Sequence, residues 1–335
     1  MMTLAELQTQ FKTLRQKTRD GDIFQSLGEA MAENIRGLSP QPVTDVSLPT
    51  DGDLALTRMQ SYSQLLETKA QDGEHAAALD VEPIADDTLA LVVAQLANPL
   101  PKYRDTGAFF FLSDVIQNQL MTEAQMRWVM SYLTTDEQLF DHIFEGNNAA
   151  IYRRSFSVLV ISLLLFTHRT KTPFLSEAQL DHVIDQVALY AALERDARGF
   201  IGTNGWAHAF THIGNAVNEI LLMPNLMRAD KLFVLASMLS GYRELQQPLV
   251  MGETNRIVAV ALQSAKTHEV YQDYVLLTLK LWRKDLVTRQ PPESEGRWHQ
   301  LYNRTRFFQT ILLQERPTVP DAIFKYVSET KDYLT

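Results

Sequence analysis

Two histidines one helical turn apart have the clearest capacity for chemistry in this sequence. His208 and His212 lie at positions i and i+4 of a helix expected over 204–222. At this spacing two imidazoles share one face of a helix, where they can move protons or bind a common metal ion. Between 194 and 221 the chain adds other capable side chains, namely Glu194, Asp196, Arg198, Trp206, Asn215 and Glu219.

The pattern around the histidine pair argues against a metal site. Zinc proteases with this spacing carry a glutamate directly after the first histidine, and that position is Ala209 here. Glu219 stands about 10 Å beyond His212 along a helix axis, and Asn215 is a poor ligand for zinc. We therefore predict no metal and no cofactor, and retain His208 and His212 only as weak metal candidates.

The polar face of the expected helix carries little charge. A helical wheel places the apolar residues on one side and His208, His212, Asn215 and Glu219 on the other. A solvated face is normally rich in Lys, Arg and Glu, yet Glu219 is the only such residue between 205 and 221. This pattern favours a lined pocket or groove; a plain solvated face and a pair of buried structural histidines are the alternatives.

Charged residues outside this helix offer partners for it. Glu194, Asp196 or Glu253 would tune a histidine that acts as an acid or a base. Asp196 and Arg198 are also suited to bridge each other and tie their loop to the next helix. Arg154 precedes an apolar helix, where a cation is unfavourable, so we expect a carboxylate or an anion beside it.

Two further patterns have structural interpretations. Glu253 and Arg256, at i and i+3, fit an exposed ion pair within one helix. The glycines at 199, 202 and 205 do not form a phosphate-binding loop, because no strand precedes them and no Gly-Lys-Ser/Thr follows. We interpret Asn204-Gly205 as a helix entry rather than a hairpin turn.

The protein is acidic and contains no cysteine. Its 335 residues include 31 Lys+Arg and 40 Asp+Glu, a net charge of −9, so we expect no nucleic-acid partner. The lack of cysteine excludes disulfides, thiol nucleophiles, thiolate zinc sites and iron–sulfur clusters. The start of the chain shows no signal-peptide pattern, and the longest apolar run, 156–166, is too short to span a bilayer. We therefore expect a cytoplasmic protein without membrane contact, with that run in a buried core helix.

Helical periodicity runs through the chain, and we find no convincing strand alternation. Proline- and glycine-marked segments at 37–52, 69–87 and 287–297 separate the periodic stretches. Many helices joined by short turns predict an all-α fold of antiparallel helix pairs stacked as a HEAT-like α-solenoid, with a closed α/α ring as the alternative. We expect a single helical domain over 1–335, in which 1–80 is an N-terminal extension. Helices are expected at 3–18, 22–36, from Leu54 onward, and at 86–97, 105–119, 123–133, 136–144, 149–167, 176–194, 204–222, 227–243, 252–264, 268–287, 295–314 and 320–333.

The histidine stretch resembles a bacterial family, the domain of unknown function 2785. The resemblance rests on a D-x-R-G-aromatic turn at 196–200 and on G-W-A-H-x-x-x-H at 205–212. The likeness extends over most of 90–315. The family pattern has Ala and Asp where this chain has Thr211 and Asn215, so the resemblance implies that a metal site of the family would be weakened here. It implies a helical fold and a site in this region without naming an activity. Shorter stretches similar to the family pattern are Arg104-Asp105, Arg154-Ser155-Phe156, and Glu253 with Arg256.

These residues suggest two functions. The first is a helical-repeat binding protein whose groove, lined by the 204–222 helix, takes a peptide, a protein or a small polar ligand. The alternative is a His-dependent or metal-assisted hydrolase or lyase, with His208, His212 and Asp196 as catalytic candidates. The residues expected to bind the ligand are Arg154, Arg198, Trp206, His208, His212, Asn215 and Glu253.

Overall fold

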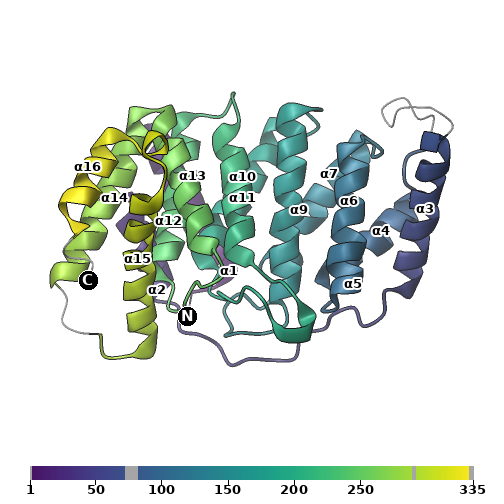
Figure 1. Ribbon diagram of the computed structural model, residues 1–335, viewed down its shortest axis with the longest axis horizontal. Helices are drawn as coiled ribbons and strands as arrows, with labels where there is room; N and C mark the ends of the chain where they lie inside the picture. The colour runs from purple at the N-terminus through teal and green to yellow at the C-terminus, as the bar shows by residue number, and fades with distance from the viewer. Residues whose placement is uncertain (1, 72–81, 289–291, 332–335) are drawn as a thin grey trace.

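The regular elements of the protein are helices that lie side by side along its long axis (Figure 1). The computed structural model describes residues 2–71, 82–288 and 292–331, and no β-strand occurs within these ranges. The helices of the first half are α1 (Leu4–Asp20), α2 (Leu27–Arg36), α3 (Asp53–Gln71), α4 (Asp86–Ala94), α5 (Pro101–Tyr103), α6 (Phe110–Gln117), α7 (Glu123–Leu133), α8 (Asp136–Leu139) and α9 (Ile151–Thr170). Those of the second half are α10 (Glu177–Leu193), α11 (Ala209–Leu222), α12 (Arg228–Glu244), α13 (Glu253–Thr267), α14 (Glu269–Thr288), α15 (Glu295–Leu313) and α16 (Asp321–Glu329).

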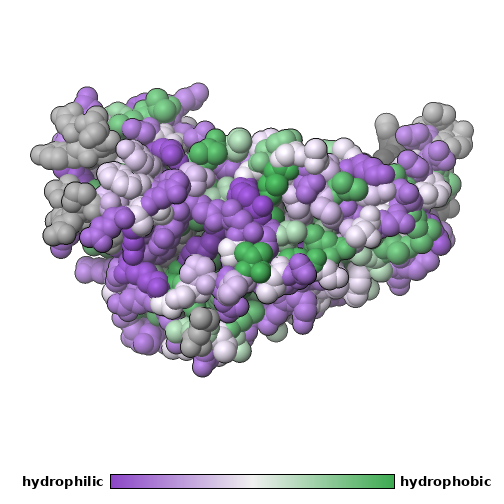
Figure 2. All heavy atoms as spheres, turned by 90° about the horizontal axis from the view of Figure 1, so that it is seen from below, coloured by the Kyte–Doolittle hydropathy of each residue, from purple (hydrophilic) through white to green (hydrophobic). Residues whose placement is uncertain are grey.

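From α9 onward, alternate helices form two layers. In one layer α9 packs on α11, α11 on α13, and α13 on α15. In the other layer α10 packs on α12, and α12 contacts α14. Seen from below, the molecule is elongated and its outline is hollowed along one long side (Figure 2). One continuous hydrophobic core extends from Leu7 in α1 to Val327 in α16.

The N-terminal helices cover the second of these layers. Helices α1 and α2 pack on α10 and α12, and residues 37–52 then cross as an extended connection to the far end, where α3 begins (Figure 1). Helix α12 explains this arrangement, because its run from Leu232 to Glu244 is buried on every side. A helix that is apolar nearly all round needs neighbours on all its faces.

Buried ion pairs join α1 to the layer beneath it. Arg15 in α1 lies 2.7 Å from Asp230 at the start of α12 and 2.8 Å from Asp185 in α10. Arg19, one turn later, pairs with the same Asp230. Because Arg15 and Asp230 are almost completely buried, each group depends on the other for its charge to be compensated.

The expected all-helical class is confirmed, and several expected helices differ in length. The helix predicted at 136–144 ends at Leu139, and the one predicted at 22–36 begins at Leu27. The segment predicted as an α-helix from 105 opens with a π-helical stretch at Arg104–Phe109. The expected loop at 69–87 and the late break at 287–297 lie partly outside the described residues.

Helix α9 contains the apolar run and is buried against α11, as expected from the sequence. Among the described helices it is the one long and apolar enough to cross a membrane by length and composition, and 72% of that stretch is buried inside the protein.

Candidate functional site

The predicted helix over 204–222 begins five residues later than expected, at Ala209. Residues 198–208 instead fold back on themselves: Ile201 N donates to Gly205 O at 2.8 Å, and Ala207 N donates to Gly199 O at 2.7 Å. The interpretation of Asn204-Gly205 as a helix entry is therefore wrong, since both residues lie near the tip of a short hairpin-like loop. Trp206 and His208 are loop residues and do not share the helical face of His212.

Arg104 and Gly205 hold this loop in place. The buried Arg104 guanidinium donates to Asn204 O at 2.7 Å and to Trp206 O at 3.1 Å. It also stacks over Tyr152, with its central carbon 4.4 Å from the ring centroid. Gly205 has φ +70°, and a Cβ there would lie 2.9 Å from Pro101 Cγ, so a larger residue would strain the backbone and collide with Pro101 of α5.

His208 adopts a backbone conformation that is rare for residues other than glycine. Its φ of 59° lies in the left-handed region, which costs about 1 kcal/mol for a residue with a Cβ. The conformation aims its imidazole at α13, where Nδ1 lies 3.3 Å from Oε1 of the buried Glu253. Neither atom makes a hydrogen bond of normal geometry. Strain of this kind is concentrated at functional sites.

The Glu253 carboxylate is fixed in position and can accept a hydrogen bond or pair with a cation. Its Oε2 accepts a hydrogen bond from the backbone N–H of Met251 at 2.8 Å. Burial raises the pKa of Glu253, but the nearby His208 imidazole and backbone N–H groups lower it more, so the net shift is downward. The group is therefore an anion behind the imidazole of His208.

His212 is a buried histidine that stays neutral. Ser155 Oγ in α9 donates to Ala207 O, so the proton between the two side chains must come from His212 Nδ1, 2.8 Å from Ser155 Oγ and 3.1 Å from Ser155 O. Burial, followed by the nearby His208 and Arg104, lowers the pKa of His212 to about 3. Such a weakly basic imidazole is suited to structural bonding rather than to acid–base work at neutral pH.

Exposed apolar side chains surround His208. The ring centroids of Trp206 and His208 are 4.6 Å apart, and those of Phe200 and Trp206 are 5.1 Å apart. Phe200 is 51% exposed and Trp206 is 43% exposed. The exposed Met251 lies against Gly199, next to Phe200. The aromatic surface (Phe200, Trp206 and Met251) thus adjoins the His208–Glu253 pair.

The charged turn at 194–198 is held by ion pairs and hydrogen bonds of its own side chains. Arg154 finds the expected carboxylate in Glu194, with atom pairs at 2.9 and 3.1 Å. Burial raises the pKa of Glu194, but the Arg154 charge lowers it more. Asp196 and Arg198 bridge each other, with Nη2 at 2.6 Å from Oδ2. These bonds stabilise the turn, and they leave Asp196 poorly placed to assist a histidine.

The remaining predicted site residues differ in whether they have a side-chain partner. Glu219 pairs with Arg169 of α9 at 2.7 Å. Asn215 is half-buried on α11, and its amide makes no hydrogen bond within the described residues. The expected exposed pair of Glu253 and Arg256 is wrong, because Glu253 turns to His208 instead. The residues brought together are therefore Trp206, His208, Glu253 and, through Ser155, His212.

A metal centre does not emerge from this arrangement. Within residues 2–71, 82–288 and 292–331, no group of three or more His, Asp or Glu side chains is placed to hold a metal ion. The two imidazole rings are 6.1 Å apart and nearly perpendicular, and the Nδ1 atom of each faces the protein.

Sequence reasoning gave no role in the site to Arg104, Ser155 or Phe200, although all three belong to the stretches that carry the family resemblance. Arg104 entered only through the family resemblance, although the positioning of the whole loop depends on it. Ser155 carried no signal of its own, since a serine at the start of an apolar helix has many roles. An indication for Phe200 was available, because an aromatic residue between two glycines of a loop has little chance of burial.

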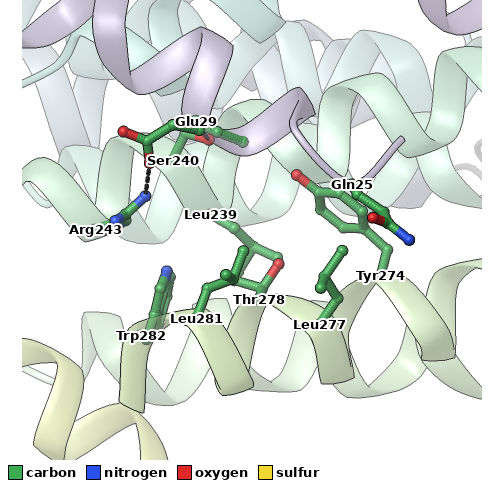
Figure 3. A pocket seen from close by; sticks show the side chains of 11 residues that line it. Gln25, Glu29, Leu239, Ser240, Arg243, Tyr274, Leu277, Thr278, Leu281 and Trp282 are labelled. Carbon is green, nitrogen blue, oxygen red and sulfur yellow. Dashed lines mark hydrogen bonds and ion pairs between the residues drawn. The ribbon is translucent and has the colours of Figure 1, made fainter. Parts of the chain in front are cut away.

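Cavities away from the His208 site are lined by other residues. One of about 230 Å³ lies where the ends of α2, α10 and α12 meet, lined on its polar side by Arg36, Arg195, Glu244 and Gln247. Another, between α2, α12 and α14, has room for about one water molecule, at about 20 Å³ (Figure 3). In Figure 3 Arg243 of α12 reaches Glu29 of α2 across it, at 2.7 Å, which closes the slot rather than opening it to a ligand.

Comparison with known proteins gives one finding. The model of a family described as "Protein of unknown function (DUF2785)" matches residues 139–313. The match begins well after residue 90, where the resemblance was expected to start, so Arg104 lies outside it, whereas the loop that Arg104 holds lies within it. No curated protein and no solved structure matches the chain.

Proposed function

Because the chain belongs to the DUF2785 family, whose description assigns no activity, we propose a function from the geometry alone: the protein binds a peptide or a segment of another protein. The binding surface consists of the aromatic surface (Phe200, Trp206 and Met251) together with His208 and Glu253. The scaffold beneath it is a HEAT-like stack, which is supported by the alternation of α9, α11, α13 and α15 in one layer with α10, α12 and α14 in the other.

The strained conformation of His208 is the observation that carries the proposal. A left-handed histidine costs stability, and in the described residues the buried Nδ1 of His208 makes no hydrogen bond of normal geometry that would offset that cost. Retention of such a residue beside exposed aromatic rings is understandable if a ligand uses the imidazole. Aromatic and methionine side chains are the residue types enriched where proteins bind one another.

A peptide selection tests this function with a matched control. Peptides selected from a random heptapeptide library on the full chain are titrated against Trp206→Ala and Trp128→Ala. Trp206 and Trp128 are 43% and 42% exposed, so their removal should affect folding to a similar, small extent. We expect about tenfold or greater loss of affinity for Trp206→Ala alone. Equal affinity for the two variants, or a selection that yields no peptide, would contradict the proposal.

A second candidate function rests on the carboxylate behind His208. In a hydrolase or lyase, Glu253 would orient the imidazole of His208 as a general base or acid, which is the partnership that such catalysis needs. His212 and Asp196 are unsuited to this role, because His212 is neutral with a low pKa and Asp196 is bound to Arg198. Turnover of chromogenic esters or of amide substrates that His208→Gln abolishes and Trp128→Ala leaves unchanged would favour this candidate.

A further inference from the structure

Arg256 in α13 is a cation without an ion-pair partner among the described residues. In the described residues its side chain makes no hydrogen bond, ion pair or ring contact, and its Nε is buried. The other arginines of these residues all engage a carboxylate, a carbonyl, an amide, an imidazole or a ring. Because a guanidinium removed from water without a partner is costly, the isolation of Arg256 needs a physical reason.

The carboxylates nearest to Arg256 are used elsewhere. Glu253, three residues earlier on the same helix, bonds to the backbone of Met251 and faces His208. Glu219 accepts two hydrogen bonds from Arg169, at 2.7 and 3.0 Å. Both acids therefore leave Arg256 without an ion-pair contact. Burial lowers the pKa of Arg256, and Glu219 compensates only in part from a distance.

Gly214 brings Arg256 onto the surface of α11. A Cβ at position 214 would lie 2.7 Å from Arg256 Cγ, so only glycine lets the arginine stem lie directly across this helix. Asn215 follows Gly214 on α11, and its amide is also without a hydrogen bond in the described residues. Arg256 is one turn from Glu253, about 4.5 Å along the axis of α13, and therefore adjoins the His208–Glu253 pair.

We propose that Arg256 is the anion-receiving part of the binding surface, with the Asn215 amide of α11 as a second donor, and takes a carboxylate of the bound peptide. The proposal rests on the proposed function and adds the chemical class of the ligand: an acidic or C-terminal segment with an apolar side chain. The planar guanidinium presents paired donors in the geometry that a carboxylate accepts. The aromatic surface receives the apolar side chain, and Arg256 receives the charge.

Calorimetric titration with two matched dipeptides tests this assignment. The probes are N-acetyl-Leu-Phe with a free C-terminal carboxylate and the same dipeptide as its carboxamide. The full-length wild type should bind the free acid about tenfold or more tightly than the amide, as expected for a hydrogen-bonded charge pair. Arg256→Gln should bind acid and amide alike, and Arg256→Lys should restore part of the preference for the acid.

Arg58→Gln is the control, because Arg58 is an exposed arginine of α3 with only a loose ion pair to Asp87 at 3.8 Å. It should keep the wild-type preference for the acid. Circular dichroism establishes that each variant is folded before it is titrated. A wild type that binds acid and amide alike, or not at all, overturns the assignment, as does a preference that survives in Arg256→Gln.

Two outcomes separate this inference from the proposed function. If the dipeptides bind through Trp206 without any preference for the acid, the binding function stands and the role of Arg256 falls. If binding of the free-acid dipeptide depends on Arg256 but is unchanged in Trp206→Ala, Arg256 is confirmed as an anion site and the proposed peptide-binding surface is wrong. Inorganic phosphate is titrated in parallel, and tighter binding of phosphate than of the free acid at Arg256 overturns the carboxylate assignment.

Discussion

The docking of α1 on α10 and α12 and the face formed by α11 and α13 use the same side-chain types in opposite ways. On the α1 side, Arg15 is buried and contacts three aspartates, of which Asp230 also holds Arg19. On the α11–α13 side, Arg256 has no partner in the described residues, and His208 faces Glu253 without a normal hydrogen bond.

This difference indicates which charges build the fold and which serve a ligand. A buried charge whose partners are complete contributes to structure, and its loss leaves the partners uncompensated. A half-buried charge without partners, next to strained backbone and exposed aromatic rings, lowers stability in the isolated protein. Such groups are expected where binding supplies the missing partner.

The largest effect is expected from the charge network of α1. Arg15→Ala removes one buried cation and leaves Asp181, Asp185 and Asp230 with incomplete compensation, so we expect a loss of about 3 kcal/mol in the free energy of unfolding. Urea denaturation measures it. Arg316→Ala, in an ion pair with the exposed Asp321, should cost less than about 0.5 kcal/mol. Equal losses of stability in the two variants would contradict the claim that the buried ion pairs of α1 stabilise the fold.

Gly205→Ala tests how firmly the site loop is built. The substitution places a Cβ at φ +70° and 2.9 Å from Pro101 Cγ, so we expect a loss of about 2 kcal/mol. The control is Gly37→Ala, at ordinary φ and in open space, which should change stability by less than about 0.5 kcal/mol. Thermal unfolding of both variants shows the difference; a Gly205→Ala protein as stable as the wild type would mean that the loop adapts freely.

His212 should make stability depend on pH between 7 and 5. Its pKa falls to about 3 in the folded protein and is about 6.5 when unfolded, so the unfolded chain takes up a proton that the folded chain refuses. The stabilisation is complete above pH 6.5 and is lost as the pH falls towards 3, by up to about 2 kcal/mol at pH 5. His212→Asn, which keeps a donor for Ser155, should flatten this dependence.

The control for the pH measurement is His299→Gln, at a histidine near the surface. Its urea midpoints at pH 7 and pH 5 should differ as much as those of the wild type. A pH dependence of the same size in His212→Asn would show that His212 is not the group responsible.

The smallest effect on stability is expected at His208. His208→Gly removes the left-handed strain, worth about 1 kcal/mol, together with the contact to Glu253, so stability should change by less than about 1 kcal/mol in either direction. Peptide affinity should nevertheless fall. A loss of stability above about 2 kcal/mol in thermal unfolding would mean that His208 serves the fold, as Arg15 does.

Local sequence signals predicted most helices, because their causes are local. The bounds of α7, 123–133, agree with the prediction, since a capping box at Thr122 begins this helix. Ser176 forms the same motif at the start of α10. The partner type of Arg154 and the bridge between Asp196 and Arg198 were also predictable, from the helix N-terminus and from proximity in sequence.

Features that depend on distant residues were out of reach of the sequence. The true start of α11 depends on Arg104, which binds carbonyl groups 100 and 102 positions away. The contact of Glu253 with His208 overrides the local pairing with Arg256, because tertiary packing brings α11 and α13 together. The docking of α1 is equally non-local, since Arg15 and Asp230 are 215 positions apart.

The most direct test of a ligand-binding face on α11 and α13 is a map of amide chemical-shift changes in the full chain when N-acetyl-Leu-Phe free acid is added. The comparison of the two regions predicts that the largest changes fall within 198–215 and 250–258 and disappear in Arg256→Gln. Changes that centre on α1, α2 and α12, or that persist in Arg256→Gln, would contradict it.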